Sequence, residues 1–270
     1  MRNTYVKFIL LPLSVLGLLG IWDFCAEPRL YKIALMGMGW FVIGCLGMEI
    51  GIHRLISHRA FECDRWLQNT LSVLGCMGAQ WSPMQWAALH VGIHHRLSDE
   101  PGDIHSPKRG LWNSYLGWYF SIRAEDINVC RVRWLLGDPF QVFLHRHYLL
   151  IFWGILSFIT LINPLIVLYE LAIPAFLTIH QTNLSNLFCH IPSLGYRNFP
   201  TKDNSVNILW WSPFSYGLAL HNNHHADAKN WNFSVRSKEW DPSASVLWLL
   251  YRLGLIELKI EEEQLTYGSE

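Results

Sequence analysis

The chain has 270 residues, of which 51% are hydrophobic, 14% aromatic and only 16% charged. Soluble domains carry about 25% charged residues, so this composition argues against an ordinary soluble protein and indicates that lipid is part of the solvent. The net charge is +0, from 21 basic and 21 acidic residues, so there is no basic surplus for binding a nucleic acid.

Two apolar runs lie near the N-terminus, from Val6 to Trp22 and from Leu30 to Ile50. A helix needs about 20 mostly apolar residues to cross a bilayer, and both runs approach that length. A signal peptide would be followed by a small-residue cleavage site, but here DFCAEPR leads directly into the second run. We therefore predict a retained transmembrane hairpin over residues 6–50, whose glycines suit close packing of its helices.

A third apolar stretch, from Trp66 to His90, is ambiguous. As a fifth crossing it would put the histidines before and after it on opposite sides of the membrane. Residues that bind one metal site must be separated by an even number of crossings. We therefore interpret this stretch as a helix buried in, or lying against, a membrane-side cap over residues 51–146.

A second hairpin is predicted over residues 147–183, with arms His147–Asn163 and Pro164–Asn183, and residues 184–270 complete the cap. The predicted fold is an all-α integral membrane protein of one domain, residues 1–270. It has four transmembrane helices, in two hairpins, under a helical cap. Because arginine and lysine are plentiful in the cap, the positive-inside rule places the cap and both termini on the cytoplasmic side.

Eight of the 13 histidines form three clusters, in the sequences HRLISH, HVGIHH and HNNHH. Residues three or four apart share a helix face, so His90 and His94 are expected to converge, as are His221 and His225. His95 and His224 lie at larger angles and are expected to reach a second point. His53 and His58 lie about 140° apart on an α-helix and are expected to serve different ions.

Eight convergent imidazoles exceed what one ion can use, so the sequence favours two metal ions. A zinc site would leave half of these ligands idle, and the clusters contain no sulfur ligand for copper(I), so iron fits best. The soluble di-iron proteins use a Glu-x-x-His pattern that is missing here. Several other residues are interpreted as structural histidines or as a solvated acidic loop: His105, His145, His147, His180, Asp99, Glu100 and Asp103.

These motifs resemble the three histidine boxes of the integral-membrane fatty acid desaturases, the acyl-CoA desaturase-like family that includes stearoyl-CoA (delta-9) desaturase. The resemblance rests on HRLISH, WAALHVGIHHRLSDEPGDIHSP and HNNHHA, and on NLFCH followed by GYRNFPTKDNS. The second box departs from the usual H-x-x-H-H by one added residue. The resemblance implies a metal-ligand set of His53, His58, His90, His94, His95, His190, His221, His224 and His225, with Asn186 acting through a water molecule.

The resemblance further implies an iron-dependent oxidoreductase of lipid metabolism and fatty acid biosynthesis. Two iron ions would use O2 as co-substrate to remove two hydrogens from a fatty acyl chain and introduce a cis, delta-9-like double bond. The acyl chain would be linked to CoA, to acyl carrier protein or to a lipid, and electrons would come from ferredoxin or cytochrome b5. Acetylenase, hydroxylase and terminal-alkene-forming decarboxylase variants remain open, as does a zinc-dependent membrane hydrolase from a different class.

Overall fold

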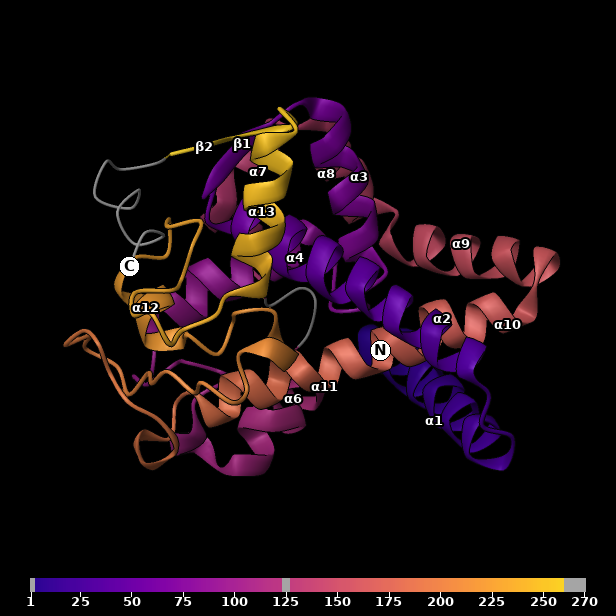
Figure 1. Cartoon of the computed structure of the whole chain (residues 1–270), viewed down its shortest axis with the longest axis horizontal. Helices are drawn as coiled ribbons and strands as arrows, with labels where there is room; N and C mark the ends of the chain where they lie inside the picture. The colour runs from indigo at the N-terminus through magenta and orange to yellow at the C-terminus, as the bar shows by residue number, and fades with distance from the viewer. Residues whose placement is uncertain (1–2, 123–126, 260–270) are drawn as a thin grey trace.

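The computed structural model describes residues 3–122 and 127–259, and two long helices form its N-terminal hairpin (Figure 1). The first arm is η1 (Val6–Leu10), continued by α1 (Leu11–Ala26). The second arm is α2 (Leu30–Trp40), continued by the π-helix η2 (Phe41–Ser57). This arm therefore runs past Ile50, and it carries the first histidine of HRLISH on the same helix that forms the hairpin.

The second hairpin begins with α8 (Pro139–Arg146), which meets α9 (Tyr148–Ile162) at a bend of 76°. The return arm runs through α10 (Pro164–Ile166), η8 (Val167–Ala172) and α11 (Ile173–Phe188) as one helix of 25 residues. In the described chain three helices are long and apolar enough to cross a membrane, and the bent pair would make a fourth. The structure thus contains three of the predicted helices as candidate spans, and that four helices cross the membrane stays a prediction.

The two hairpins pack closely because small residues lie where their helices meet. A Cβ atom at Gly39 in α2 would lie 2.3 Å from the backbone oxygen of Glu170 in η8. At Gly20 in α1 it would lie 2.7 Å from a side-chain carbon of Ile173. Glycine therefore allows a backbone approach that any larger side chain would prevent, as the glycine content of the second run predicts.

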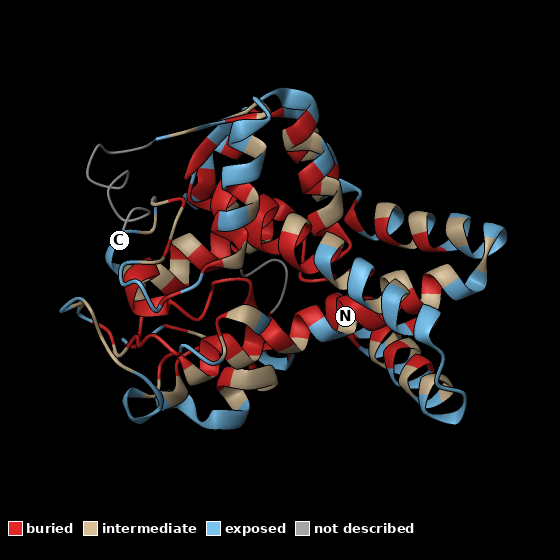
Figure 2. Ribbon diagram, viewed as in Figure 1, coloured by how far each residue is buried: buried red, intermediate tan, exposed pale blue. Residues whose placement is uncertain are grey.

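The outer surfaces of the hairpins expose large apolar side chains, whereas the interior of the cap is buried (Figure 2). Leu18, Trp22, Leu150, Phe158 and Leu161 are exposed by 57%, 70%, 71%, 65% and 87%. Soluble monomers rarely expose contiguous apolar surface on this scale. Lipid contact accounts for these side chains.

The ambiguous stretch from Trp66 to His90 is broken into two short helices, α3 (Arg65–Cys76) and α4 (Pro83–Leu89). The break contains Ala79 and Trp81, whose φ angles of 55° and 76° are incompatible with a continuing helix. Neither helix is long enough to cross a bilayer. The structure therefore agrees with a cap location for this stretch.

The remaining cap helices are short. After α4 come η3 (His90–His94), α5 (His95–Leu97), η4 (Pro107–Arg109), η5 (Asn113–Gly117), α6 (Trp118–Ser121), η7 (Val129–Val132), α7 (Arg133–Leu136), and, past the second hairpin, η9 (Pro192–Leu194), η10 (Pro213–Ser215), α12 (His221–Ala226) and α13 (Pro242–Arg252). The prediction of an all-α fold needs one correction. β1 (Phe61–Cys63) pairs antiparallel with β2 (Ile256–Leu258), and this small sheet joins the segment after the first histidine cluster to the C-terminal region.

Candidate metal centre

The nine histidines of the predicted ligand set come together in the cap as two adjacent groups. Within each group, the candidate ligand atoms all lie within 4.8 Å of one another. The first group, here called group one, contains His53, His58, His90, His95 and His224. The second, group two, contains His94, His190, His221 and His225.

In group one the Nε2 atoms form a chain of short contacts. The separation is 3.0 Å between His53 and His224, 2.9 Å between His224 and His95, 3.0 Å between His95 and His90, and 2.8 Å between His90 and His58. Two nitrogens bound at right angles to one ion, each about 2.1 Å from it, are about 3.0 Å apart. The spacing of these atoms therefore matches neighbouring ligands of a single metal ion.

Group two shows a contact that is unfavourable without a cation. His190 Nδ1 lies 2.8 Å from a carboxylate oxygen of Asp99, and His221 Nδ1 lies 3.2 Å from the carbonyl oxygen of Leu218. Each Nδ1 must donate to its oxygen, so each Nε2 of the neutral ring carries a lone pair and no hydrogen. These two Nε2 atoms face each other at 3.1 Å. A shared metal ion would turn this repulsion into attraction.

Two further ring nitrogens of group two, the Nε2 atoms of His94 and His225, are buried without a hydrogen-bond partner. An unsatisfied buried polar atom costs about 1–3 kcal/mol, and such atoms are rare in folded proteins. Both are ligand atoms that a metal ion would satisfy. The donor set of this chain therefore fits transition-metal ions in both groups.

π-Helical turns decide which histidines share a group. The N–H of His95 donates to the carbonyl oxygen of His90, and that of His58 to the carbonyl oxygen of His53; both are i→i+5 bonds. This pattern places residues five apart on one face, where an α-helix aligns residues four apart. The predictions that His90 and His94 converge, and that His53 and His58 serve different ions, are therefore wrong.

The same turn accommodates the added residue in the second box. In an H-x-x-H-H box on an α-helix the first and last histidines are four apart and share a face. Here they are five apart, as His90 and His95, and η3 is π-helical over this segment. In the third box His221 and His225 share group two while His224 points into group one, as their spacing on an α-helix predicts.

In group two, carboxylates bind the Nδ1 atoms of two rings, on the side opposite the candidate ligand atom Nε2. Asp203 Oδ2 lies 2.5 Å from His225 Nδ1, and Asp99 Oδ2 also accepts from the backbone N–H of Asn204 at 2.8 Å. Burial opposes ionisation of Asp99, but its interactions with His190, together with hydrogen bonds from Ser106 and the Asn204 N–H, outweigh burial and lower the pKa to about 2. These partners fix the tautomer and orientation of a ligating histidine.

The acidic loop after the second box is only partly the solvated face that we expected. Glu100 is exposed, but Asp99 and Asp103 are buried. Asp103 accepts from the backbone N–H groups of Asp99 and His105, both at 3.0 Å, and its carboxylate lies 3.5 Å from His94 Nδ1. The interpretation as surface charge is therefore wrong for these two aspartates, because the loop folds under the histidine groups.

Glu49 has the corresponding role in group one, where it accepts from His53 Nδ1 at 3.0 Å. Its negative charge is balanced by the fully buried Arg54, which also contacts Asp241 at 2.8 Å. The Arg54 guanidinium also lies 3.9 Å above the ring of Phe233. Sequence reasoning missed Arg54, Asp203 and Asp241; the only available signal was the charged residue inside HRLISH.

Burial lowers the pKa of six of the nine imidazoles and so favours their neutral form. Desolvation, reinforced by neighbouring histidines, lowers the pKa of His58, His90, His95, His221 and His224 well below its usual value. Desolvation likewise lowers the pKa of His225, to about 4. Because only the neutral imidazole has a lone pair to offer, burial prepares these side chains for metal binding.

Two asparagines inside HNNHHA anchor the third box. Asn222 accepts from the backbone N–H groups of Asn198 and Phe199, both at 2.8 Å. Asn223 donates to the carbonyl oxygen of Phe233 at 2.8 Å and accepts from the side chain of Asn207 at 2.7 Å. These hydrogen bonds hold the short helix α12 in place, so the asparagines position their histidine neighbours.

Of the four histidines interpreted as structural, His105 lies beside the two histidine groups. It belongs to a third possible ligand group with His94 and Asp103, so its assignment as a residue apart is wrong. His145 contacts Ser82 Oγ at 2.9 Å and His180 contacts the hydroxyl of Tyr115 at 2.5 Å, as structural residues do. His147 is exposed.

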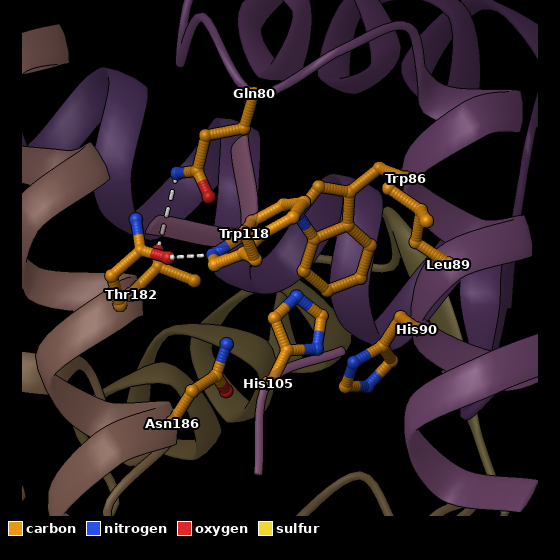
Figure 3. Close-up of a pocket in the computed structure, with 9 residues that line it drawn as sticks. Gln80, Trp86, Leu89, His90, His105, Trp118, Thr182 and Asn186 are labelled. Carbon is orange, nitrogen blue, oxygen red and sulfur yellow. Dashed lines mark hydrogen bonds between the residues drawn. The ribbon is translucent and has the colours of Figure 1, made fainter. Parts of the chain in front are cut away.

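A cavity of about 20 Å³ adjoins the groups (Figure 3). That is enough space for one water molecule. Asn186, His90 and His105 face it from one side, and Trp86 and Trp118 from the other. Thus Asn186 lies beside a water-sized space next to group one.

Comparison with known proteins agrees with the histidine pattern. A family model described as fatty acid desaturase matches residues 31–229. Delta-9 acyl-lipid desaturase 2 of Arabidopsis thaliana is 34% identical over 69% of this chain and 61% of its own length. The sn-1 stearoyl-lipid 9-desaturase of Anabaena variabilis is 30% identical over 86% of both chains. The hex-5-enoyl-[acyl-carrier protein] acetylenase of Moorena producens is 28% identical over 81% of this chain and 74% of its own. The match spans about three fifths of the Arabidopsis protein.

Proposed function

The chain belongs to the fatty acid desaturase family, and from that premise we propose that it is an oxidoreductase that introduces a double bond into a fatty acyl chain, using O2 and two iron ions. The observation that carries the proposal is the pair of adjacent imidazole groups, five and four histidines, whose candidate ligand atoms lie within 4.8 Å of one another in each group. Group one would hold one ion and group two the other. Asn186 would act through a water molecule in the adjoining cavity.

Iron, when bound, supplies redox chemistry strong enough to break unactivated C–H bonds, which zinc lacks. The overall reaction removes two hydrogens from neighbouring carbons and reduces O2 to two waters. Four electrons are needed: two come from the C–H bonds and two from an external donor, ferredoxin or cytochrome b5. The cis, delta-9-like product is the form that we propose, and it agrees with the printed names of the plant and cyanobacterial relatives.

The residues of this chain provide orientation and exclude water. Asp99, Asp203 and Glu49 hold ring nitrogens so that the opposite nitrogens point into the groups. The side chains of His53 and His190 are each only 1% exposed.

The apolar helices and the family indicate a membrane protein. We propose further that four helices cross the membrane and that the cap and both termini lie on the cytoplasmic side. The acyl carrier is open among CoA, acyl carrier protein and lipid, since relatives are named for lipid-linked and for carrier-protein-linked substrates.

The test is expression in a host with a simple fatty-acid profile, followed by gas chromatography of its lipids. A new unsaturated peak is expected, and His221→Ala should abolish it. His147→Ala is the matched control, because His147 is exposed and lies outside both groups. A peak unchanged in His221→Ala would contradict the site.

Metal analysis of the purified protein separates the classes of function. Close to two irons per chain is expected from the two histidine groups. One zinc and no iron would replace the proposal with a membrane hydrolase. A second product is considered because one relative is named an acetylenase. A fatty acid with a triple bond would appear in the same chromatogram with a distinct mass. Hydroxylated fatty acids and terminal alkenes would also be resolved there.

A further inference from the structure

The two histidine groups differ in the charge that lies behind their rings. In group two, three of the four rings have a carboxylate oxygen near Nδ1: His190 has Asp99 at 2.8 Å, His225 has Asp203 at 2.5 Å, and His94 has Asp103 at 3.5 Å. The side chains of these aspartates are exposed by only 3%, 9% and 0%, in that order. Because aspartate is ionised at neutral pH, group two has three buried negative charges next to its rings.

In the described chain no lysine or arginine forms an ion pair with these three carboxylates. Besides the rings, their hydrogen-bond donors are hydroxyl and backbone N–H groups, which belong to Thr201, Ser205, Ser106, Asn204, Asp99 and His105. The nearby cations donate to the backbone carbonyl oxygens of the same aspartates: Lys108 to Asp99, Arg109 to Asp103 and Arg197 to Asp203. None of these cations is buried, so water and salt screen their charges more than those of the carboxylates.

In group one a single carboxylate contacts a ring, and a buried cation balances it. Glu49 Oε1 lies 3.0 Å from His53 Nδ1, and the Arg54 guanidinium donates to the same oxygen at 3.2 Å. Arg54 also pairs with Asp241 at 2.8 Å, so these three charged residues together carry one negative charge. In the described chain no carboxylate forms an ion pair with the other four rings of group one, and His224 Nδ1 has no hydrogen-bond partner.

We propose that the two metal positions are inequivalent: group two binds its ion first and more tightly, and the ion in group one is the more easily reduced. The inference rests on the proposed two-ion function. Buried negative charge attracts a cation strongly because the protein interior screens it little, and a carboxylate that accepts from Nδ1 makes Nε2 a more basic ligand.

The number of donors alone predicts the opposite order of binding, because group one offers five imidazoles and group two offers four. The charge behind the rings should outweigh this difference. One orienting partner is worth about 10–100-fold in metal affinity, and group two has two more carboxylates beside its rings than group one.

The same charges favour the ferric ion over the ferrous ion in group two, since the more highly charged ion gains more from negative surroundings. When the oxidised protein takes up one electron, the reductant is oxidised by one electron and one Fe³⁺ becomes Fe²⁺. That Fe²⁺ should lie in group one.

The first test titrates the metal-free protein with Co²⁺, whose visible absorption reports binding without turnover, in competition with a chelator. Two steps are expected, with dissociation constants that differ by about tenfold or more. His221→Ala should remove the tighter step and His53→Ala the weaker one. Asp203→Asn should weaken the tighter step alone, by about tenfold or more, and Glu49→Gln the weaker step alone.

Asp227→Asn is the matched control for Asp203→Asn, because Asp227 is exposed and accepts from the backbone N–H of Lys229. Two equal constants, loss of the tighter step in His53→Ala, or equal effects of Asp203→Asn and Asp227→Asn would overturn the inequivalence. Binding of only one Co²⁺ in total would overturn it together with the two-ion centre. Two unequal steps in a protein that produces no desaturation would support the inequivalence and contradict the proposed function alone.

The second test loads the protein with isotopically enriched iron, oxidises it, and adds one electron per chain from dithionite. Mössbauer spectroscopy should then show one ferric and one ferrous signal. Glu49→Gln should change the parameters of the ferrous signal, and Asp203→Asn those of the ferric signal. A ferrous signal that responds to Asp203→Asn and not to Glu49→Gln would overturn the proposed order of reduction.

Discussion

Deleting Val91 offers the sharpest test of how the second histidine box is built. The deletion shortens H-x-x-x-H-H to H-x-x-H-H and leaves His90 and His95 four residues apart. In an α-helix four residues amount to 400°, so the two side chains would lie about 40° apart on one face. At the present spacing an α-helix would separate them by about 140°, which on a helix of about 5–6 Å radius displaces a ring by about 10 Å. The observed π-turn removes that displacement.

We therefore expect the Val91 deletion to change η3 into an ordinary α-helical turn and to retain iron. Metal analysis should find close to two irons per chain, the content proposed for the wild type, because both groups keep their members. The matched variant inserts an alanine after Val91. It places His90 and His95 six apart, a spacing that neither helix type aligns, so group one should lose its ion. Loss of iron from the deletion as complete as from the insertion, or two irons retained by the insertion, would refute the reasoning.

Three further outcomes are expected. Asp203→Asn removes the carboxylate behind His225 and should weaken iron affinity about 10–100-fold, measured by competition with a chelator; unchanged affinity would count against the orienting role. Gly39→Leu should reduce thermal stability and yield, because a Cβ atom there meets Glu170, whereas Gly37→Ala, with open space around it, should not. Below pH about 6.5 the metal-free protein should lose stability in thermal melts, because burial lowers the pKa of His58, His90, His95, His221, His224 and His225, so that at these positions the unfolded chain takes up protons and the folded chain does not. This contribution to stability should be complete above that pH, and a flat profile from pH 8 to 5 would exclude the linkage.

The histidine pattern alone predicted much of the centre, because the ligands are local features of the chain. HRLISH, HVGIHH and HNNHH each place several imidazoles within one or two helical turns. A metal site needs such donors whatever fold brings them together. Apolar runs near 20 residues likewise follow from the bilayer thickness, so the long helices could be predicted without tertiary information.

The division of the histidines into two groups depended on helix type, which the sequence did not reveal. An α-helical spacing pairs His90 with His94, but the π-turn pairs His90 with His95. The same holds for His53 and His58. Since a π-turn changes a single hydrogen-bond offset, its composition resembles that of the α-helix around it, and tertiary packing decides between them.

The orienting carboxylates were beyond sequence reasoning because they are distant in the chain from the rings that they hold. Asp99 contacts His190 across 91 residues, and Arg54 contacts Asp241 across 187. An aspartate in a polar loop has the same local composition whether it faces water or folds inward. The sequence by itself therefore determined the histidines of the candidate site, the apolar helices and the family. Only the tertiary structure decided how these histidines divide between two groups and which carboxylates orient their rings. Both choices depend on contacts between segments that are far apart in the chain.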